Sequence, residues 1–96
     1  MNREEIIATL KIEKQFLSEK FGVEEIALFG SYARNEQTED SDIDVLVKLR
    51  EPKLKPLIGV LEFLENKFHK KIDITAKHKY LTDRFWNVVN DDIIYV

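Results

Sequence analysis

Residues 26–47 read IALFGSYARNEQTEDSDIDVLV, and this stretch decides the fold. Its first four residues are apolar and indicate a short buried strand that ends at Gly30. Ser31 is suited to cap a short helix through about Asn35, because a serine hydroxyl can accept a hydrogen bond from the backbone of the first helical turn. After a polar loop, residues 41–49 alternate acidic and apolar side chains and then become wholly apolar. This pattern predicts a second strand that is buried on both faces.

The remaining sequence alternates helical and strand patterns around this stretch. Apolar residues recur every three or four positions in residues 2–20, 54–68 and 81–89, which predicts three further helices. Gly22 should end the first of them in a left-handed conformation. Residues 71–75 predict a third strand, which we expect to be central in so small a sheet, and a β-branched segment follows at 93–96. The alternation predicts an α/β fold, with one small sheet and helices packed against it.

Composition narrows the class of protein. A chain of 96 residues is expected to form one domain over residues 1–96. No apolar run approaches the roughly 20 residues that span a bilayer, and the first residues do not resemble a secretion signal, so a cytoplasmic protein without membrane contact is expected. Cysteine is absent, so a metal site must use oxygen or imidazole ligands, and the formal charge of −3 argues against stable binding of duplex nucleic acid.

Three aspartates are the strongest chemical signal. Asp42 and Asp44 are two residues apart on a predicted strand, so their side chains should leave the same face. Asp73 lies between two isoleucines of the next predicted strand. One aspartate alone is readily explained as a solvated residue at a strand end. Three carboxylates around one point repel each other unless a cation lies between them, and they suit Mg²⁺ or Mn²⁺.

Gly30 and Ser31 follow a strand and open a helix, a geometry that presents free backbone N–H groups to an anion. A phosphate could bind there, and the serine hydroxyl would add a donor. A Gly-Ser pair after a strand is also a common turn, so this pair gains meaning only beside the aspartates.

The stretches 28–34 and 41–47 resemble the signature of the DNA polymerase beta-like nucleotidyltransferases, in particular the minimal nucleotidyltransferases, and the likeness extends over nearly the whole chain. The resemblance implies the small nucleotidyltransferase fold with one mixed sheet. It also implies catalytic and metal-binding roles for Asp42, Asp44 and Asp73, with two Mg²⁺ ions and ATP as the substrate. Nucleotide contacts are implied for Gly30 and Ser31, and Arg34 and Ser41 are further candidates. The family motif usually has glycine where this chain has Asn35, a residue that also tolerates the left-handed conformation.

The same resemblance implies a biological setting. Minimal nucleotidyltransferases are commonly antitoxins that transfer AMP from ATP to a tyrosine of a HEPN-family ribonuclease toxin. Two alternatives stay open: a binding-only antitoxin that occludes its toxin, and an enzyme that adds nucleotides to an RNA end. The intact acids count against the first, and the acidic net charge counts against the second.

Four apolar residues fall outside the expected core stripes of their helices: Ile12, Phe16, Val60 and Phe63. If they are exposed, they could anchor a protein partner. Alternatively, they belong to the core.

Overall fold

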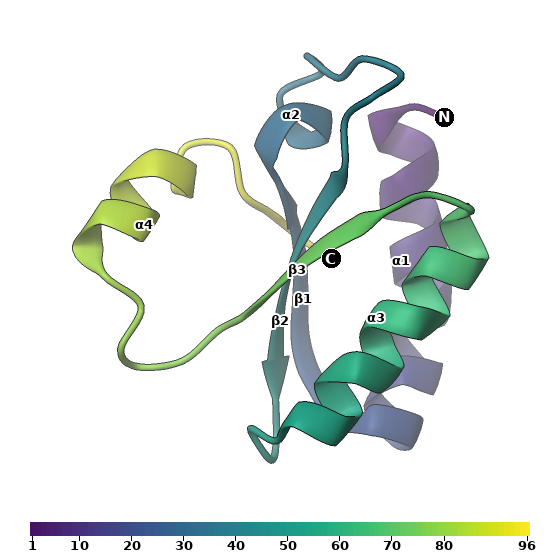
Figure 1. Cartoon of the computed structure of the whole chain (residues 1–96), viewed down its shortest axis with the longest axis vertical. Helices are drawn as coiled ribbons and strands as arrows, with labels where there is room; N and C mark the ends of the chain where they lie inside the picture. The colour runs from purple at the N-terminus through teal and green to yellow at the C-terminus, as the bar shows by residue number, and fades with distance from the viewer.

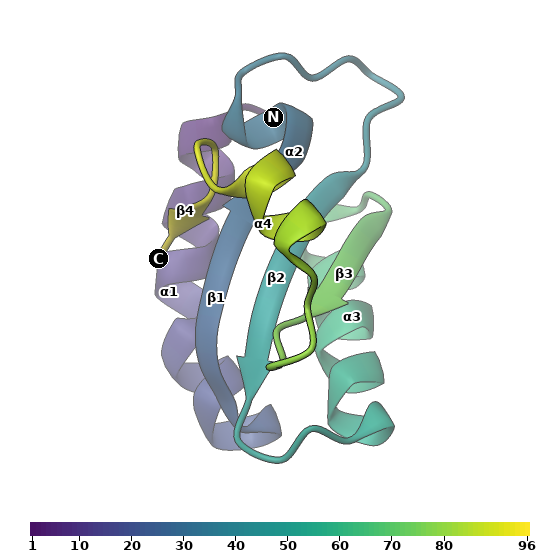
Figure 2. The ribbon, with the colours of Figure 1, turned by 90° about the vertical axis from the view of Figure 1, so that its left-hand side faces the viewer.

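The computed structural model describes residues 1–96, which form four helices and four strands (Figure 1). The helices are α1 (Arg3–Phe21), α2 (Gly30–Ala33), α3 (Leu54–Phe68) and α4 (Asp83–Val89), and the strands are β1 (Val23–Phe29), β2 (Ile43–Leu49), β3 (Ile72–Ala76) and β4 (Ile94–Tyr95). Helices α1 and α3 cover one face of the sheet, and α4 lies on the other (Figures 1 and 2). The predicted α/β fold with one small sheet is confirmed. None of the helices combines the length and apolar character needed to cross a bilayer.

The sheet is mixed and has the strand order β3-β2-β1-β4. Strand β1 pairs with β2 and with β4 in antiparallel fashion, whereas β2 and β3 are parallel. The expectation that the strand carrying Asp73 is central was therefore wrong, because β3 is an edge strand. The additional short strand at the end of the chain pairs with the free side of β1, and no strand covers the outer side of β3.

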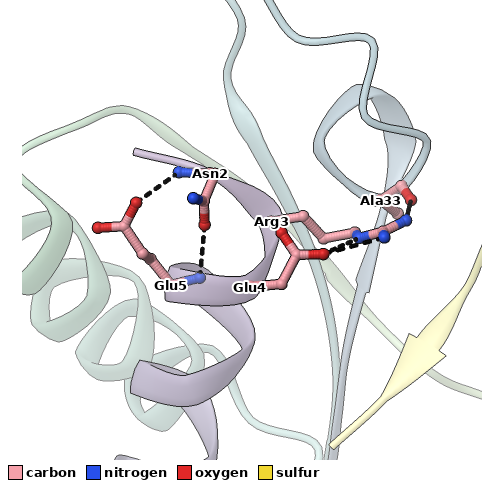
Figure 3. Close-up of polar contacts among 5 residues, drawn as sticks. All are labelled: Asn2, Arg3, Glu4, Glu5 and Ala33. Carbon is pink, nitrogen blue, oxygen red and sulfur yellow. Dashed lines mark hydrogen bonds and ion pairs between the residues drawn. The ribbon is translucent and has the colours of Figure 1, made fainter.

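The start of α1 is fixed next to α2. Asn2 accepts a hydrogen bond from the Glu5 N–H at 2.8 Å, and its own N–H donates to the Glu5 carboxylate at 3.2 Å, which is a reciprocal cap of the helix (Figure 3). The Arg3 guanidinium donates to the Ala33 carbonyl at 3.2 Å, at the end of α2. At the other end of α1, Gly22 takes the expected left-handed conformation with φ 75°. The capped helix thus supports the turn that carries Gly30 and Ser31.

The main core lies between the sheet and the two long helices. Its fully buried side chains include Ile6, Leu10, Leu17, Ile26, Leu28, Ile43, Val45, Val47, Val60 and Leu64. A second, smaller cluster lies under α4, where Val89 packs with Ala27, Phe29 and Leu46.

Of the two alternatives left open for Val60, the core is the correct one, because α3 turns Val60, Leu64 and Phe68 inward while Ile58 is exposed. The missing side chain of Gly59 makes room for the Phe21 ring, so α3 and α1 can approach closely there. The other three residues differ in exposure. Ile12 and Phe16 are exposed, and Phe63 is half-buried with its ring 5.0 Å from that of Phe16. An apolar patch from α1 therefore remains at the surface, but Val60 contributes nothing to it.

Candidate active site

Parallel pairing of β2 with β3 brings two aspartates together. In the register of the two strands Asp44 is the direct partner of Asp73, so their side chains leave the same face of the sheet. Asp42 precedes Asp44 by two residues and shares that face. The strand starts that carry these residues lie at the same end of the sheet as α2 (Figure 2). The structure therefore gathers the three predicted acids at one end of the face that α4 partly covers.

The acids differ in exposure and in electrostatics. Asp44 is half-buried, whereas Asp73 is exposed. The pKa of the Asp44 carboxyl is raised from 3.8 to about 6. Burial is the largest cause, the neighbouring Asp73 and Asp42 carboxylates contribute to the rise, and Arg34 acts in the opposite direction. The three negative charges crowd one another, and a cation among them would relieve this repulsion.

Gly30 lies directly against the Asp44 carboxylate. The antiparallel register places Phe29 opposite Asp44, and Gly30 follows with a left-handed φ of 74°. A Cβ atom at Gly30 would lie 2.8 Å from the Asp44 carboxyl carbon and closer still to one of its oxygens. Only glycine lets the backbone of the α2 turn approach the acid so closely.

Ser31 does not cap α2, contrary to the expectation. Phe29 occupies the N-cap position without a side-chain hydrogen bond, and Ser31 lies inside the first turn. The helix starts two residues earlier than the pattern suggested, since its N-cap is Phe29 instead of Ser31 and Gly30 itself belongs to it. Its end is as expected, because Asn35 adopts a left-handed φ of 59°.

Arg34 and Ser41 have protein partners in the structure. The Arg34 guanidinium lies 3.6 Å from carboxylate oxygens of both Glu36 and Asp92. The Ser41 hydroxyl accepts a hydrogen bond from the Thr38 N–H at 2.9 Å and so fastens the loop that leads to Asp42. The nucleotide contacts expected of Arg34 and Ser41 stay predictions.

Two charged residues at this end of the sheet were not among the predicted site residues, although Lys71 belongs to a basic stretch, residues 67–71, that could approach phosphates. Asp92 holds Arg34 from the segment after α4, and the Lys71 ammonium lies 3.9 Å from a carboxylate oxygen of Asp42. Both contacts join residues distant in the chain, and no local pattern indicates them. Arg34 and Lys71 thus form a charged cluster with the three aspartates at this end of the sheet.

The carboxylates of the site suit a hard divalent cation whose coordination shell is completed by the substrate. No three carboxylate or imidazole side chains are arranged to hold a metal ion among themselves. Asp42 faces Lys71, and Asp44 faces Asp73. Mg²⁺ commonly binds one or two carboxylates together with phosphate oxygens of the substrate, so an incomplete protein shell suits it.

An α/β fold with paired acids beside a glycine-opened turn is the arrangement of a nucleotidyl-transferring enzyme. The chain belongs to the nucleotidyltransferase family, whose domain model matches residues 10–95. A Thermococcus cleftensis relative named protein adenylyltransferase MntA is 40% identical over 94 residues, which cover 97% of this chain and 94% of the relative. The chain is accordingly an enzyme of the adenylyltransferase class.

Solved structures agree with this fold. A structure provisionally described as a minimal nucleotidyltransferase has a TM-score of 0.78 and 28% identity, and the match covers 98% of this chain and 95% of that chain. A chain from a toxin–antitoxin crystal structure with AMP-PNP has a TM-score of 0.67 and 20% identity, over 99% of this chain and 72% of the other. The second likeness concerns the fold alone.

Proposed function

We propose that this protein is an antitoxin that transfers AMP from ATP to a tyrosine hydroxyl of a cognate HEPN-family ribonuclease toxin and thereby neutralises it. The observation that carries the proposal is the pairing of Asp44 with Asp73 beside Gly30, which gathers acids at a turn suited to phosphate. The 40% identity to a named protein adenylyltransferase, over nearly all of both chains, supports a protein as the acceptor. The choice of a HEPN toxin and of tyrosine follows the family resemblance of residues 28–47.

The acids have distinct tasks in this proposal. Asp42 and Asp44 would hold two divalent cations, Mg²⁺ or Mn²⁺, together with the triphosphate, and Asp73 would share the second of them. Such cations supply charge neutralisation at the phosphates and favour deprotonation of the acceptor hydroxyl. The backbone at Gly30 and Ser31 would bind the triphosphate, because the start of the α2 turn offers free N–H groups.

The proposed reaction transfers AMP from ATP to the acceptor hydroxyl and releases pyrophosphate. The acceptor oxygen forms a bond to the α-phosphorus, the bond from this phosphorus to the bridging oxygen of pyrophosphate breaks, and the hydroxyl proton is released. Burial and the crowding of carboxylates disfavour the charged form of Asp44. The protein is thus prepared to gain more from a cation than an isolated carboxylate would.

Mass spectrometry of the intact partner tests the proposal. With Mg-ATP and the enzyme, the toxin should gain one or more AMP units, and Asp73→Ala should abolish this gain while complex formation persists. Toxin inhibition at equal protein without ATP would instead identify an occluding binder. Incorporation of nucleotide into RNA but not into the toxin would identify an RNA-end enzyme.

A further inference from the structure

Lys71 differs from the other basic residues near the acids. Only one of the three acids has an ion-pair partner: Asp42, whose partner is Lys71. The nearby lysines are already engaged, since Lys70 donates to the Glu39 carbonyl at 2.9 Å and Lys67 lies 3.1 Å from the Glu13 carboxylate. Arg34 lies 3.6 Å from two carboxylates. Lys71 has one long contact, 3.9 Å to Asp42, and is the cation here that a ligand can recruit at least cost.

The backbone of Lys71 is fixed, although its side chain is largely exposed. The Lys71 carbonyl accepts a hydrogen bond from the Ile43 N–H at 3.1 Å, which anchors the residue beside β2. If the register of β2 and β3 is continued by one residue, Lys71 lies opposite Asp42, two residues before the pair Asp44 and Asp73. Because residues two apart in a strand share a face, Lys71 lies on the same face as Asp73. Its ammonium is therefore held at the edge of the acid cluster.

The pair with Asp42 contributes little to stability. The Lys71 side chain is 76% exposed, that of Asp42 is 40% exposed, and the two atoms are 3.9 Å apart. Exposed pairs of this kind contribute about 0–1 kcal/mol to folding. The ammonium can accordingly leave Asp42 without loss of the fold, and it is available to a phosphate that binds beside the acids.

We propose that Lys71 is a polyphosphate-binding residue whose ammonium moves from Asp42 to the phosphate chain of the bound nucleotide. This inference rests on the proposed function. A lysine ammonium is a compact cation with three donors and binds phosphate well as a point charge. Lys71 would also stabilise the charge that appears on pyrophosphate as it leaves. Asp42 serves as its resting partner, and its carboxylate is freed for a cation when the nucleotide arrives.

Calorimetry with ATP and AMP tests this role through binding alone. Lys71→Gln should weaken Mg-ATP binding about tenfold, which corresponds to about 1.4 kcal/mol, and should change AMP binding less than about twofold, because AMP lacks the outer phosphates. Lys71→Arg should restore most of the ATP affinity, since it keeps the charge. The melting temperature of Lys71→Gln should equal that of the unchanged protein.

Lys53→Gln is the matched control. The Lys53 side chain is 72% exposed and pairs with Glu51 at 3.1 Å, but it follows the far end of β2. It should bind ATP like the unchanged protein. Equal ATP affinity in Lys71→Gln, or an equal loss in Lys53→Gln, would overturn the role of Lys71 while the proposed function stands. Absence of Mg-ATP binding by the unchanged protein would overturn both.

Discussion

Replacement of Gly30 by alanine should both destabilise the protein and abolish nucleotidyl transfer. The left-handed φ of 74° costs a residue with a Cβ atom about 1–2 kcal/mol. The added Cβ would also lie 2.8 Å from the Asp44 carboxyl carbon, so the acid must leave its favoured rotamer at a further cost of about 1 kcal/mol. The expected loss is about 2–3 kcal/mol, or about 10–20 °C in melting temperature for a domain of this size.

Gly22→Ala separates the two contributions. Gly22 has φ 75°, and a Cβ there would meet only the Cβ of Arg50 at an ordinary 3.7 Å. This variant should lose only the conformational part of the stability, about 1–2 kcal/mol, and should retain transfer and Mg-ATP affinity. Thermal unfolding followed by circular dichroism, together with AMP transfer measured by intact mass, decides the matter. If Gly30→Ala kept its activity and had the same melting temperature as Gly22→Ala, the close approach of Gly30 to Asp44 would be refuted.

Three further outcomes follow from the site and the core. Because burial and neighbouring acids raise the pKa of Asp44 from 3.8 to about 6, the native state binds a proton that the unfolded chain has lost, and stability falls as the pH rises through this window. The full pKa difference corresponds to about 3 kcal/mol, which solvent screening should reduce to about 1–2 kcal/mol. Asp44→Asn should therefore melt higher than the unchanged protein at pH 7.5, and this gain should shrink toward pH 4. An equal gain at both pH values would contradict the raised pKa of Asp44. Gly59→Ala should lower the melting temperature despite the better helix propensity of alanine, because its Cβ would collide with the Phe21 ring, and Mg-ATP affinity should not change. Mg-ATP at a hundred times its Kd should add about 2.7 kcal/mol to the free energy of unfolding, and EDTA should remove this gain in a denaturant titration.

The sequence predicted correctly those structural features that depend only on neighbouring residues. Gly22 marks the end of α1 by capping chemistry that involves only neighbouring residues. The spacing of Asp42 and Asp44 fixes their common face by strand alternation. The left-handed end of α2 at Asn35 likewise needs no tertiary information.

Features that depend on distant contacts could not be predicted. The edge position of β3 follows from the pairing of a two-residue strand with β1, and such a short segment carries no signal for its partner. Val60 is fully buried in the packed core, and the Phe21 ring of α1 fills the space at Gly59 beside it. Lys71 and Asp92 acquire their places beside the site only when the sheet is assembled.

The edge position of β3 has a consequence for solubility. A strand with a free side offers unpaired backbone groups to other chains, and charged side chains and short length are ways to prevent association through such an edge. Strand β3 has five residues, begins beside Lys71 and carries the exposed Asp73. The Asp73 carboxylate, which we propose as a metal ligand, is thus also expected to disfavour association through this edge. Alanine variants of Asp73 should be checked for oligomers before any lost activity is interpreted.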